Sequence, residues 1–335
     1  GAASFGAIFF FFLKVLLRPS FSEPLFEKQR SIMVQSLEQG MHDANRVAQR
    51  LQRCAIYGKG HPYSWTFEEG IAYLQSLTLD DMRKMHSQYV RPDHMVVSVA
   101  GDLEPSTVEA SITAVATGWE PNGYRPPVFP IDRTHEVVQL TNPLARDQVV
   151  LGLSRPSAVK VHDPEYLALD LLGTICFYDL GSRLLALRER TGLFYHATGA
   201  WATGIHQEHG YDSILLTINP DKISFAMGEV MNMLQQVIDG GVTEEEVASA
   251  KQIYLKDMID VTTDPRSIAM MFANIETLGL GYDYYDTALQ RINTITAKEI
   301  SAIARTYAST SGFSRVIVGT QRAAGEPEAS EDYSE

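Results

Sequence analysis

One stretch of the sequence brings together side chains that could hold a metal. In GIHQEHGYD, residues 204–212, two histidines flank a glutamate: His206, Glu208 and His209. The stretch is one residue short of H-x-x-E-H, the inverted zinc-peptidase motif, in which a helix brings residues i and i+4 to the same ion. Here glycines mark a turn between two β-like runs, and nothing predicts a helix. We therefore expect these three residues to form an exposed hairpin loop without a metal.

Composition limits the class of protein that could position such residues. The chain has 335 residues, of which 45% are hydrophobic and 21% charged, and this is typical of a globular protein long enough for two domains. Its formal net charge of -13 argues against a nucleic-acid partner or an anionic membrane, because both need a basic surface. Cys54 and Cys176 are expected to be free thiols.

The two ends of the chain have contrasting compositions. The apolar run FGAIFFFFLKVLL, residues 5–17, is far shorter than the roughly 20 residues that span a bilayer. We expect no membrane insertion there, but a buried helix or strand. Residues 321–335 are acidic and poor in apolar side chains, and we expect them to be disordered.

An internal repeat accounts for the length. LTLDDMRKMHSQY (77–89) matches ITAKEISAIARTY (295–307) at an offset of 218, as two threonine-capped amphipathic helices. Each is followed at that offset by a β-rich run ending in glycine, VVSVAG (96–101) and RVIVG (315–319). FSEPLFEKQR (21–30) matches VTEEEVASAK at an offset of 221. The chain is therefore expected to contain two related α+β units in tandem.

The second unit can be read completely from its hydrophobic pattern. Strands are predicted within 147–156, 193–204, 211–220 and 314–319, with helices between and after them. This order predicts an antiparallel or mixed sheet with helices on one face. We assign 1–122 to the first unit, 123–140 to a proline-rich linker, 141–320 to the second unit and 321–335 to the tail.

The first unit looks incomplete when it is aligned on the second. Subtracting the offset of 221 from the start of the second unit near residue 146 gives about -75, so two or three strands and a helix have no counterpart. The sequence leaves two explanations open. Either the natural chain is longer at its N-terminus, or a separate subunit supplies the missing part.

Several phrases in this order resemble the insulinase/pitrilysin family of metallopeptidases, especially its two-domain subunits such as the mitochondrial processing peptidase and bacterial relatives. The most specific are LLRPSFSEPLFEKQR, GKGHPYS, VVSVAGDL, GSRLLALRERTGLFYH and GGVTEEEVASAK. The resemblance runs from about residue 13 to residue 320. It implies a chamber for unfolded peptides and a zinc ion held by H-x-x-E-H on the first helix of the first unit, ahead of residue 1.

The resemblance also implies a third zinc ligand, a glutamate on the helix after PSF, with another glutamate seven residues before it. The aligned positions hold Ser36 and Gln29. Serine is a poor zinc ligand, and glutamine carries no charge to offset the metal. A shift of two residues would bring in Glu38, but it turns the side chain by about 200° on a helix. We therefore expect no zinc in this chain, and zinc only in a partner subunit.

A second catalytic element of the family is an arginine followed seven residues later by a tyrosine, which contact the substrate backbone near the scissile carbonyl. RERTGLFY matches it with Arg188 and Tyr195. A guanidinium and a phenol can stabilise an oxyanion opposite the metal. The alternative is a surface arginine and an ordinary strand aromatic.

Three functions are compatible with this resemblance. The first is a zinc-less subunit that binds an unfolded, basic peptide and contributes Arg188 and Tyr195 to the zinc site of a homologous partner, being inactive alone. The second is a structural core subunit of a respiratory bc1-type complex. The third is an active zinc endopeptidase truncated at its N-terminus, which Gln29 and Ser36 oppose. The compartment stays open.

Overall fold

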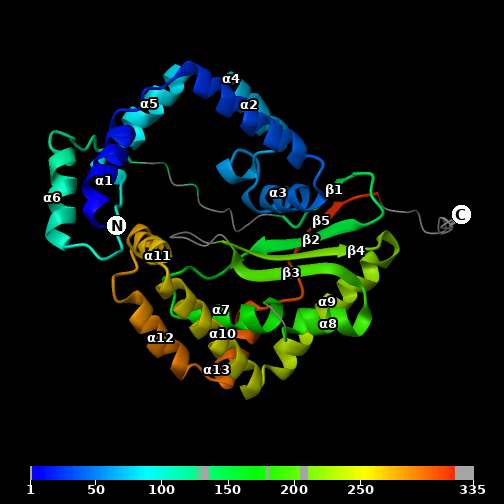
Figure 1. The fold of residues 1–335 in the computed structure, drawn as a ribbon. Coiled ribbons are helices and arrows are strands. Elements are labelled where there is room, and N and C mark those ends of the chain that lie inside the picture. The colour runs from blue at the N-terminus through cyan, green and yellow to red at the C-terminus, as the bar shows by residue number, and fades with distance from the viewer. Residues whose placement is uncertain are drawn as a thin grey trace, which may run out of the picture. The chain divides into compact units, whose positions relative to one another are not determined.

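The fold is a mixed α+β arrangement, as expected (Figure 1). The structure, a computed structural model, describes residues 2–125, 127, 129, 136–178, 181–203 and 210–320. The chain divides into two compact units, each made of three separate segments. The helical unit comprises Gly1–Glu38, Phe67–Val128 and Ile253–Leu289, and the sheet unit comprises Gln39–Thr66, Phe129–Gln252 and Gln290–Glu335. The boundaries at residues 122 and 141 stay predictions, because compactness and sequence repetition are different properties.

Helices are the regular elements of the helical unit, together with one short 3-10 turn. They are α1 (Ala2–Leu17), α2 (Glu23–Gly40), α4 (Phe67–Ser76), α5 (Leu79–Tyr89), α6 (Pro105–Ala116) and α11 (Pro265–Leu278), with the turn at Pro92–His94. Two further helices, α10 (Glu244–Thr263) and α12 (Tyr284–Thr294), are shared with the sheet unit, which also includes the last two residues of α2. Of the helices described, none combines the length and apolarity that crossing a membrane requires.

Helix α1 forms from the apolar run, but the expectation that this run is buried is wrong. Phe9 and Leu13, one helical turn apart, are buried, while Ile8, Phe11 and other large apolar side chains of the helix are exposed. Helix α1 packs on α6, and in the described part of the unit only one of its faces is covered. The apolar composition left both a helix and a strand open, and it did not show what would surround the segment.

The strand expected at 96–101 is also not formed. The described residues 95–100 have no regular secondary structure and pair with no strand, although Met95 has an extended backbone. A strand needs a partner for its backbone hydrogen bonds. The corresponding run in the second half of the chain does form strand β5, because it lies between two other strands.

The described part of the sheet unit contains a sheet of five strands in the order β1-β5-β2-β4-β3. Only β1 and β5 are parallel among these pairs. The strands are β1 (Gln139–Asn142), β2 (Val149–Pro156), β3 (Phe194–Thr203), β4 (Tyr211–Ile218) and β5 (Ser314–Val318). The helices are α3 (Ala44–Tyr57), α7 (Tyr166–Phe177), α8 (Arg183–Thr191), α9 (Ile223–Gly240) and α13 (Ala297–Tyr307), with 3-10 turns at Pro62–Ser64 and Pro220–Lys222. The strands and helices predicted for the second repeat are confirmed.

Helices cover both faces of this sheet, because α3, which belongs to the predicted first unit, adds a layer on the face opposite the helices of the second unit. Helix α3 packs on β2 and β5 from one side, and α7 and α8 lie on the other (Figure 1). The buried Gln52 of α3 donates from Nε2 to the backbone oxygen of Leu153 at 3.0 Å and to Ser213 Oγ at 3.1 Å. Strand β2 is buried along most of its length, and such a strand needs cover on both sides.

Gly199 shows how closely α7 approaches the sheet. A Cβ atom at this position of β3 would lie 2.6 Å from Cδ1 of Phe177, whose ring is buried against Trp201. We expect Gly199→Ala to lower the free energy of unfolding by about 1–3 kcal/mol through overpacking. Gly228→Ala is the matched control on α9, where nothing lies within 4 Å, and it should gain about 0.5–1 kcal/mol. Urea unfolding of both variants checks this, and equal effects would contradict it.

The element bounds repeat along the chain in the same way as the sequence. Helices α1, α2 and α3 begin 221 residues before α9, α10 and α11, from Ala2 to Ile223, Glu23 to Glu244 and Ala44 to Pro265. Helices α5 and α13 begin and end 218 residues apart. Their caps also match, since Thr78 accepts from the backbone N–H of Asp81 and Thr296 from that of Glu299. The predicted threonine caps are confirmed.

Candidate functional site

Arg188 lies in the last turn of the short helix α8, close to where the chain enters strand β3. Ser182 caps the helix by accepting from the N–H of Leu185, and Gly192 ends it in a left-handed conformation with φ 62°. The tight turn brings the guanidinium back over the chain, where Arg188 Nε donates to the backbone oxygen of Phe194 at 3.0 Å. The structure therefore fixes Arg188 beside the residue that precedes Tyr195.

Tyr195 occupies an irregularity of the edge strand β3. Phe194 pairs with Ile218 and His196 pairs with Thr217, so the register shifts at Tyr195 as in a β-bulge. Its side chain is exposed, whereas Phe194 is buried. A bulge turns a side chain away from the regular alternation of the strand. The structure brings Arg188 and Tyr195 to the same end of β3, with the phenol and the guanidinium both accessible.

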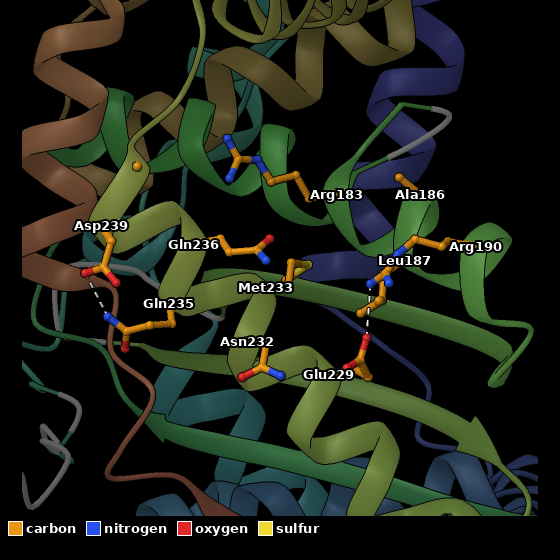
Figure 2. A pocket seen from close by; sticks show the side chains of 11 residues that line it. Arg183, Ala186, Leu187, Arg190, Glu229, Asn232, Met233, Gln235, Gln236 and Asp239 are labelled. Atoms are coloured by element: carbon orange, nitrogen blue, oxygen red, sulfur yellow. Dashed lines mark hydrogen bonds and ion pairs between the residues drawn. The ribbon is translucent and has the colours of Figure 1, made fainter.

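A polar groove of about 840 Å³ lies beside this turn, between α8 and α9 (Figure 2). Arg183 and Arg190 enter it from α8, and Glu229 and Asp239 from α9. Arg190 forms an ion pair with Glu229 at 3.0 Å, shown by a dashed line in Figure 2. Arg188 does not line this groove. The groove is therefore separate from the residues predicted from the family.

Arg183 connects α8 to the start of α10. Its Nε donates to Oε1 of Glu246 at 2.7 Å, and its terminal nitrogen reaches the backbone oxygen of Gly241 at 2.8 Å. Burial pushes the pKa of Glu246 up, but hydrogen bonds from Arg183 and from the Thr243 backbone outweigh this and leave the pKa lowered. Glu246 is therefore a stable carboxylate that holds α8 in place.

The positions aligned with the family's zinc ligands do not fit zinc. Gln29 and Ser36 lie two turns apart on the exposed face of α2. Neither an amide nor a hydroxyl supplies the imidazole, thiolate or carboxylate donor that zinc requires. In the part of the chain that the structure describes, no three histidine, cysteine, aspartate or glutamate side chains are grouped to hold a metal ion. We therefore derive no step through zinc from this chain's own residues.

The histidine-rich stretch lies outside the described residues. These are 204–209 and include His206, Glu208 and His209, so the predicted hairpin loop stays a prediction, although its flanking strands β3 and β4 do pair.

Asp212, which follows the histidine-rich stretch in the sequence, belongs to a buried ion pair that the sequence did not indicate. Asp212 accepts from Arg155 Nε at 2.8 Å and from the N–H of Ala202 at 3.0 Å. Burial raises the pKa of Asp212, and Arg155 and Ala202 oppose this only in part.

His61 and the two cysteines have structural roles. His61 Nδ1 accepts from the N–H of Tyr63, so its Nε2 carries the proton and donates to the backbone oxygen of Phe129 at 2.9 Å. Its ring stacks on Tyr57 at 4.4 Å. Within the described residues Cys54 and Cys176 form no disulfide, as expected, and burial raises the pKa of Cys176 to about 12. The Cys176 thiol is therefore not set up as a nucleophile, since thiolates are the reactive form.

Comparison with protein families tests the resemblance that the sequence suggested. Residues 76–254, just over half of the chain, match the family model described as the peptidase M16 inactive domain. The chain belongs to this family. The resemblance to insulinase-like peptidases is thereby confirmed, and the match includes α8 and the start of β3 with Arg188 and Tyr195.

Relatives of this M16 chain include proteins with and without a peptidase name. An uncharacterized zinc protease of Mycobacterium leprae is 24% identical over 287 residues, covering 83% of this chain and 62% of the relative. The non-peptidase homolog YmxG of Helicobacter pylori is 21% identical over 322 residues, covering 92% of this chain and 71% of the relative. The M16 chain thus spans about two thirds of the length of these relatives.

Solved structures share the fold at low identity. The peptidase M16 inactive domain from Pseudomonas fluorescens has a TM-score of 0.79 at 20% identity, covering 94% of this chain and 75% of that chain. A chain of Complex III2 from Candida albicans has a TM-score of 0.73 at 8% identity, covering 92% and 73%. Both likenesses concern the fold alone.

Proposed function

We propose that this M16 chain is a zinc-less subunit of a two-subunit peptidase. It binds an unfolded peptide and presents Arg188 and Tyr195 to the zinc site of a homologous partner. The observation that carries the proposal is the geometry at the start of β3, where one hydrogen bond holds Arg188 beside the exposed, bulged Tyr195.

The guanidinium of Arg188 is held in position by one hydrogen bond and keeps further donors available. Its Nε binds the backbone oxygen of Phe194, and within the described residues its two terminal nitrogens have no hydrogen-bond partner. These nitrogens can donate together to a carbonyl oxygen on which charge develops, and the phenol of Tyr195 can add a third donor. The anchoring bond reduces the side-chain entropy that Arg188 would otherwise lose on binding a substrate.

Strand β3 offers a surface for the peptide itself. In the described sheet it pairs with β4 on one side and with no strand on the other. An extended peptide can add to such an edge by backbone hydrogen bonds, while alternate side chains give selectivity. Tyr195 lies at one end of this edge, so a peptide that pairs with β3 would pass the Arg188–Tyr195 pair. The chain's formal charge of -13 favours basic peptides.

We also infer that the two halves of the chain are related copies, the first without its front part. The supporting observations are the matched helix bounds and the matched caps. In this arrangement Gln29 and Ser36 lie where the first copy would supply a third ligand, so the metal comes from the partner subunit. The third alternative, a truncated active peptidase, needs ligands that these positions do not offer.

Reconstitution tests the proposed function. The purified chain, a homologous H-x-x-E-H subunit from the same genome, and their mixture would each be assayed for zinc content and for hydrolysis of an unfolded basic peptide. We expect about one zinc per mixed pair, and cleavage only in the mixture. Cleavage by the chain alone would contradict the proposal. So would a mixture no faster than the zinc subunit alone, or isolation of the chain only within a respiratory complex.

A further inference from the structure

A groove lies over the β1 side of the sheet, on the face opposite helix α3. Gly152 shows which face this is, because a Cβ atom at Gly152 would lie 3.0 Å from the side chain of Gln52 on α3. Side chains alternate along a strand, so the neighbouring Leu151 and Leu153 point away from α3. Both line the groove, together with residues of α9, β1 and β5. All the lining residues belong to the sheet unit.

The groove has two parts that meet at three residues. The larger part has a volume of about 440 Å³ and the smaller part about 260 Å³, and Gln139, Met227 and Arg315 line both. Sites for small molecules typically have volumes of about 300–1,000 Å³. The groove therefore has the size of a site for a small organic ligand.

The larger part is mostly apolar and can adapt its shape. Met227 and Met231 lie one turn apart on α9, so their side chains share a face of the helix. Methionine side chains are flexible and polarisable, and they pack against ligands of different shapes. The other apolar side chains of this part are Val137, Val138, Leu153 and Phe313. Such a lining favours a hydrocarbon chain without selecting one length.

One arginine stands where the two parts meet. Arg315 belongs to β5, an inner strand, and its neighbours across the sheet are Gln139 on β1 and Leu153 on β2. Phe313 and Ile317, two residues before and after it, are buried, whereas Arg315 is exposed. The groove therefore leaves the guanidinium accessible at a position of the sheet where its neighbours on the same face are covered.

The guanidinium of Arg315 has no anionic partner among the described residues, and no hydrogen bond engages its nitrogens there. The one carboxylate in the described lining is that of Asp221, which is exposed and lies 3.5 Å from Nζ of Lys222. A cation beside apolar side chains attracts an anion more strongly than a cation in water, because the local dielectric constant is lower. The groove is thus complementary to a ligand that is both apolar and anionic.

We propose that this groove binds a small amphipathic carboxylate, with its head group at Arg315 and Gln139 and its hydrocarbon chain against Met227 and Met231. The planar guanidinium can donate two N–H groups to the two carboxylate oxygens. The side-chain amide of Gln139 can donate to the same head group. This site is separate from the candidate site at α8 and β3, and the proposal does not depend on the proposed function.

The charges around the groove favour a carboxylate over other head groups. One guanidinium balances one negative charge. A phosphate monoester carries about two negative charges at pH 7, and the second would face the carboxylate of Asp221 without a counter-ion. An ammonium head group would be repelled by Arg315. A single negative charge on a planar, bidentate acceptor therefore fits best.

Isothermal titration calorimetry with decanoate tests the site in the purified chain. We expect saturable binding of one decanoate per chain, and binding of decanol, which has the same hydrocarbon chain without the charge, about 10-fold weaker or more. Arg315→Gln should weaken decanoate binding about 10-fold or more and leave decanol binding unchanged. Arg305→Gln is the matched control and should change neither, because Arg305 is an exposed arginine of α13 that does not line the groove.

Methionine NMR locates the hydrocarbon chain. With the 11 methionines labelled at their methyl carbons, each Met→Leu substitution removes one resonance and so assigns it, and such a swap largely preserves packing. Decanoate should shift the resonances of Met227 and Met231. It should not shift that of Met233, which lines the other groove, toward α8.

Several results would overturn the proposal. They are equal decanoate affinity in the Arg315→Gln variant, decanol binding as tight as that of decanoate, or shifts confined to methionines other than Met227 and Met231. Absence of saturable binding at millimolar decanoate would also overturn it, and that result needs no variant to fold.

Discussion

Asp212→Ala is expected to lower the free energy of unfolding by about 3–5 kcal/mol, because it leaves a buried guanidinium without its counter-ion. Arg155 is nearly buried and donates to Asp212 from Nε at 2.8 Å. Its other nitrogens bind the backbone oxygens of Tyr307 at 2.7 Å and Ser309 at 3.5 Å. Without Asp212, the charge would remain between the rings of Trp201 and Phe313, which cannot neutralise it.

Two controls distinguish the cost of leaving a buried charge unpaired from the cost of losing an ion pair in general. Asp80→Ala removes the pair between Asp80 and Arg83, which is largely exposed, and should cost less than about 1 kcal/mol. The double variant Arg155→Met with Asp212→Leu should recover most of the stability, because neither charge is then buried alone. Urea unfolding at pH 7 measures all three variants. A cost for Asp212→Ala no larger than that for Asp80→Ala would show that Asp212 is not essential to this packing.

The features that the sequence predicted correctly are those that depend on neighbouring residues. A threonine followed three residues later by an acidic side chain predicted the starts of α5 and α13, and both caps are present. The strands of the sheet unit were predicted from short runs rich in Val, Ile and Leu. The region that matches the M16 inactive domain, residues 76–254, contains three of the local phrases, VVSVAGDL, GSRLLALRERTGLFYH and GGVTEEEVASAK.

The features that the sequence did not predict depend on distant partners. The run 96–101 has the composition of a strand, but within the described residues it pairs with no other strand. Likewise, Arg155 and Asp212 are 57 positions apart, and only the pairing of β2 with β4 places them opposite each other. The ion pair could have been predicted only if the register of those two strands had been known. Pairing a lone aspartate in β4 with an arginine in β2 requires that register to be known.

The local surroundings of the candidate site were only partly predictable. Gly192, just after α8, is typical of a helix end, and the structure confirms its left-handed conformation. The bulge at Tyr195 and the hydrogen bond from Arg188 to Phe194 have no sequence pattern of their own. The bulge and the hydrogen bond determine that the side chains of Arg188 and Tyr195 are accessible. The residues of the candidate site could therefore be identified from the sequence, but their geometry could not.

The largest expected effect on activity is that of Arg188→Ala in the reconstituted peptidase. It should lower kcat about 100- to 1000-fold while leaving KM nearly unchanged, because the guanidinium acts on charge that develops in the transition state. Tyr195→Phe should lower kcat less, since it removes one neutral donor and keeps the ring. Steady-state kinetics of the mixed subunits on an unfolded basic peptide measures both.

Arg190→Ala is the matched control, because Arg190 lies on the same helix turn but pairs with Glu229 instead of Phe194. It should leave kcat unchanged and cost at most about 1 kcal/mol of stability. Comparing the two variants thus distinguishes a role of the arginine in the reaction from a role in holding α8 in place. If both variants lose activity equally, the loss comes from the helix. If Arg188→Ala raises only KM, the guanidinium binds the peptide but does not stabilise the transition state.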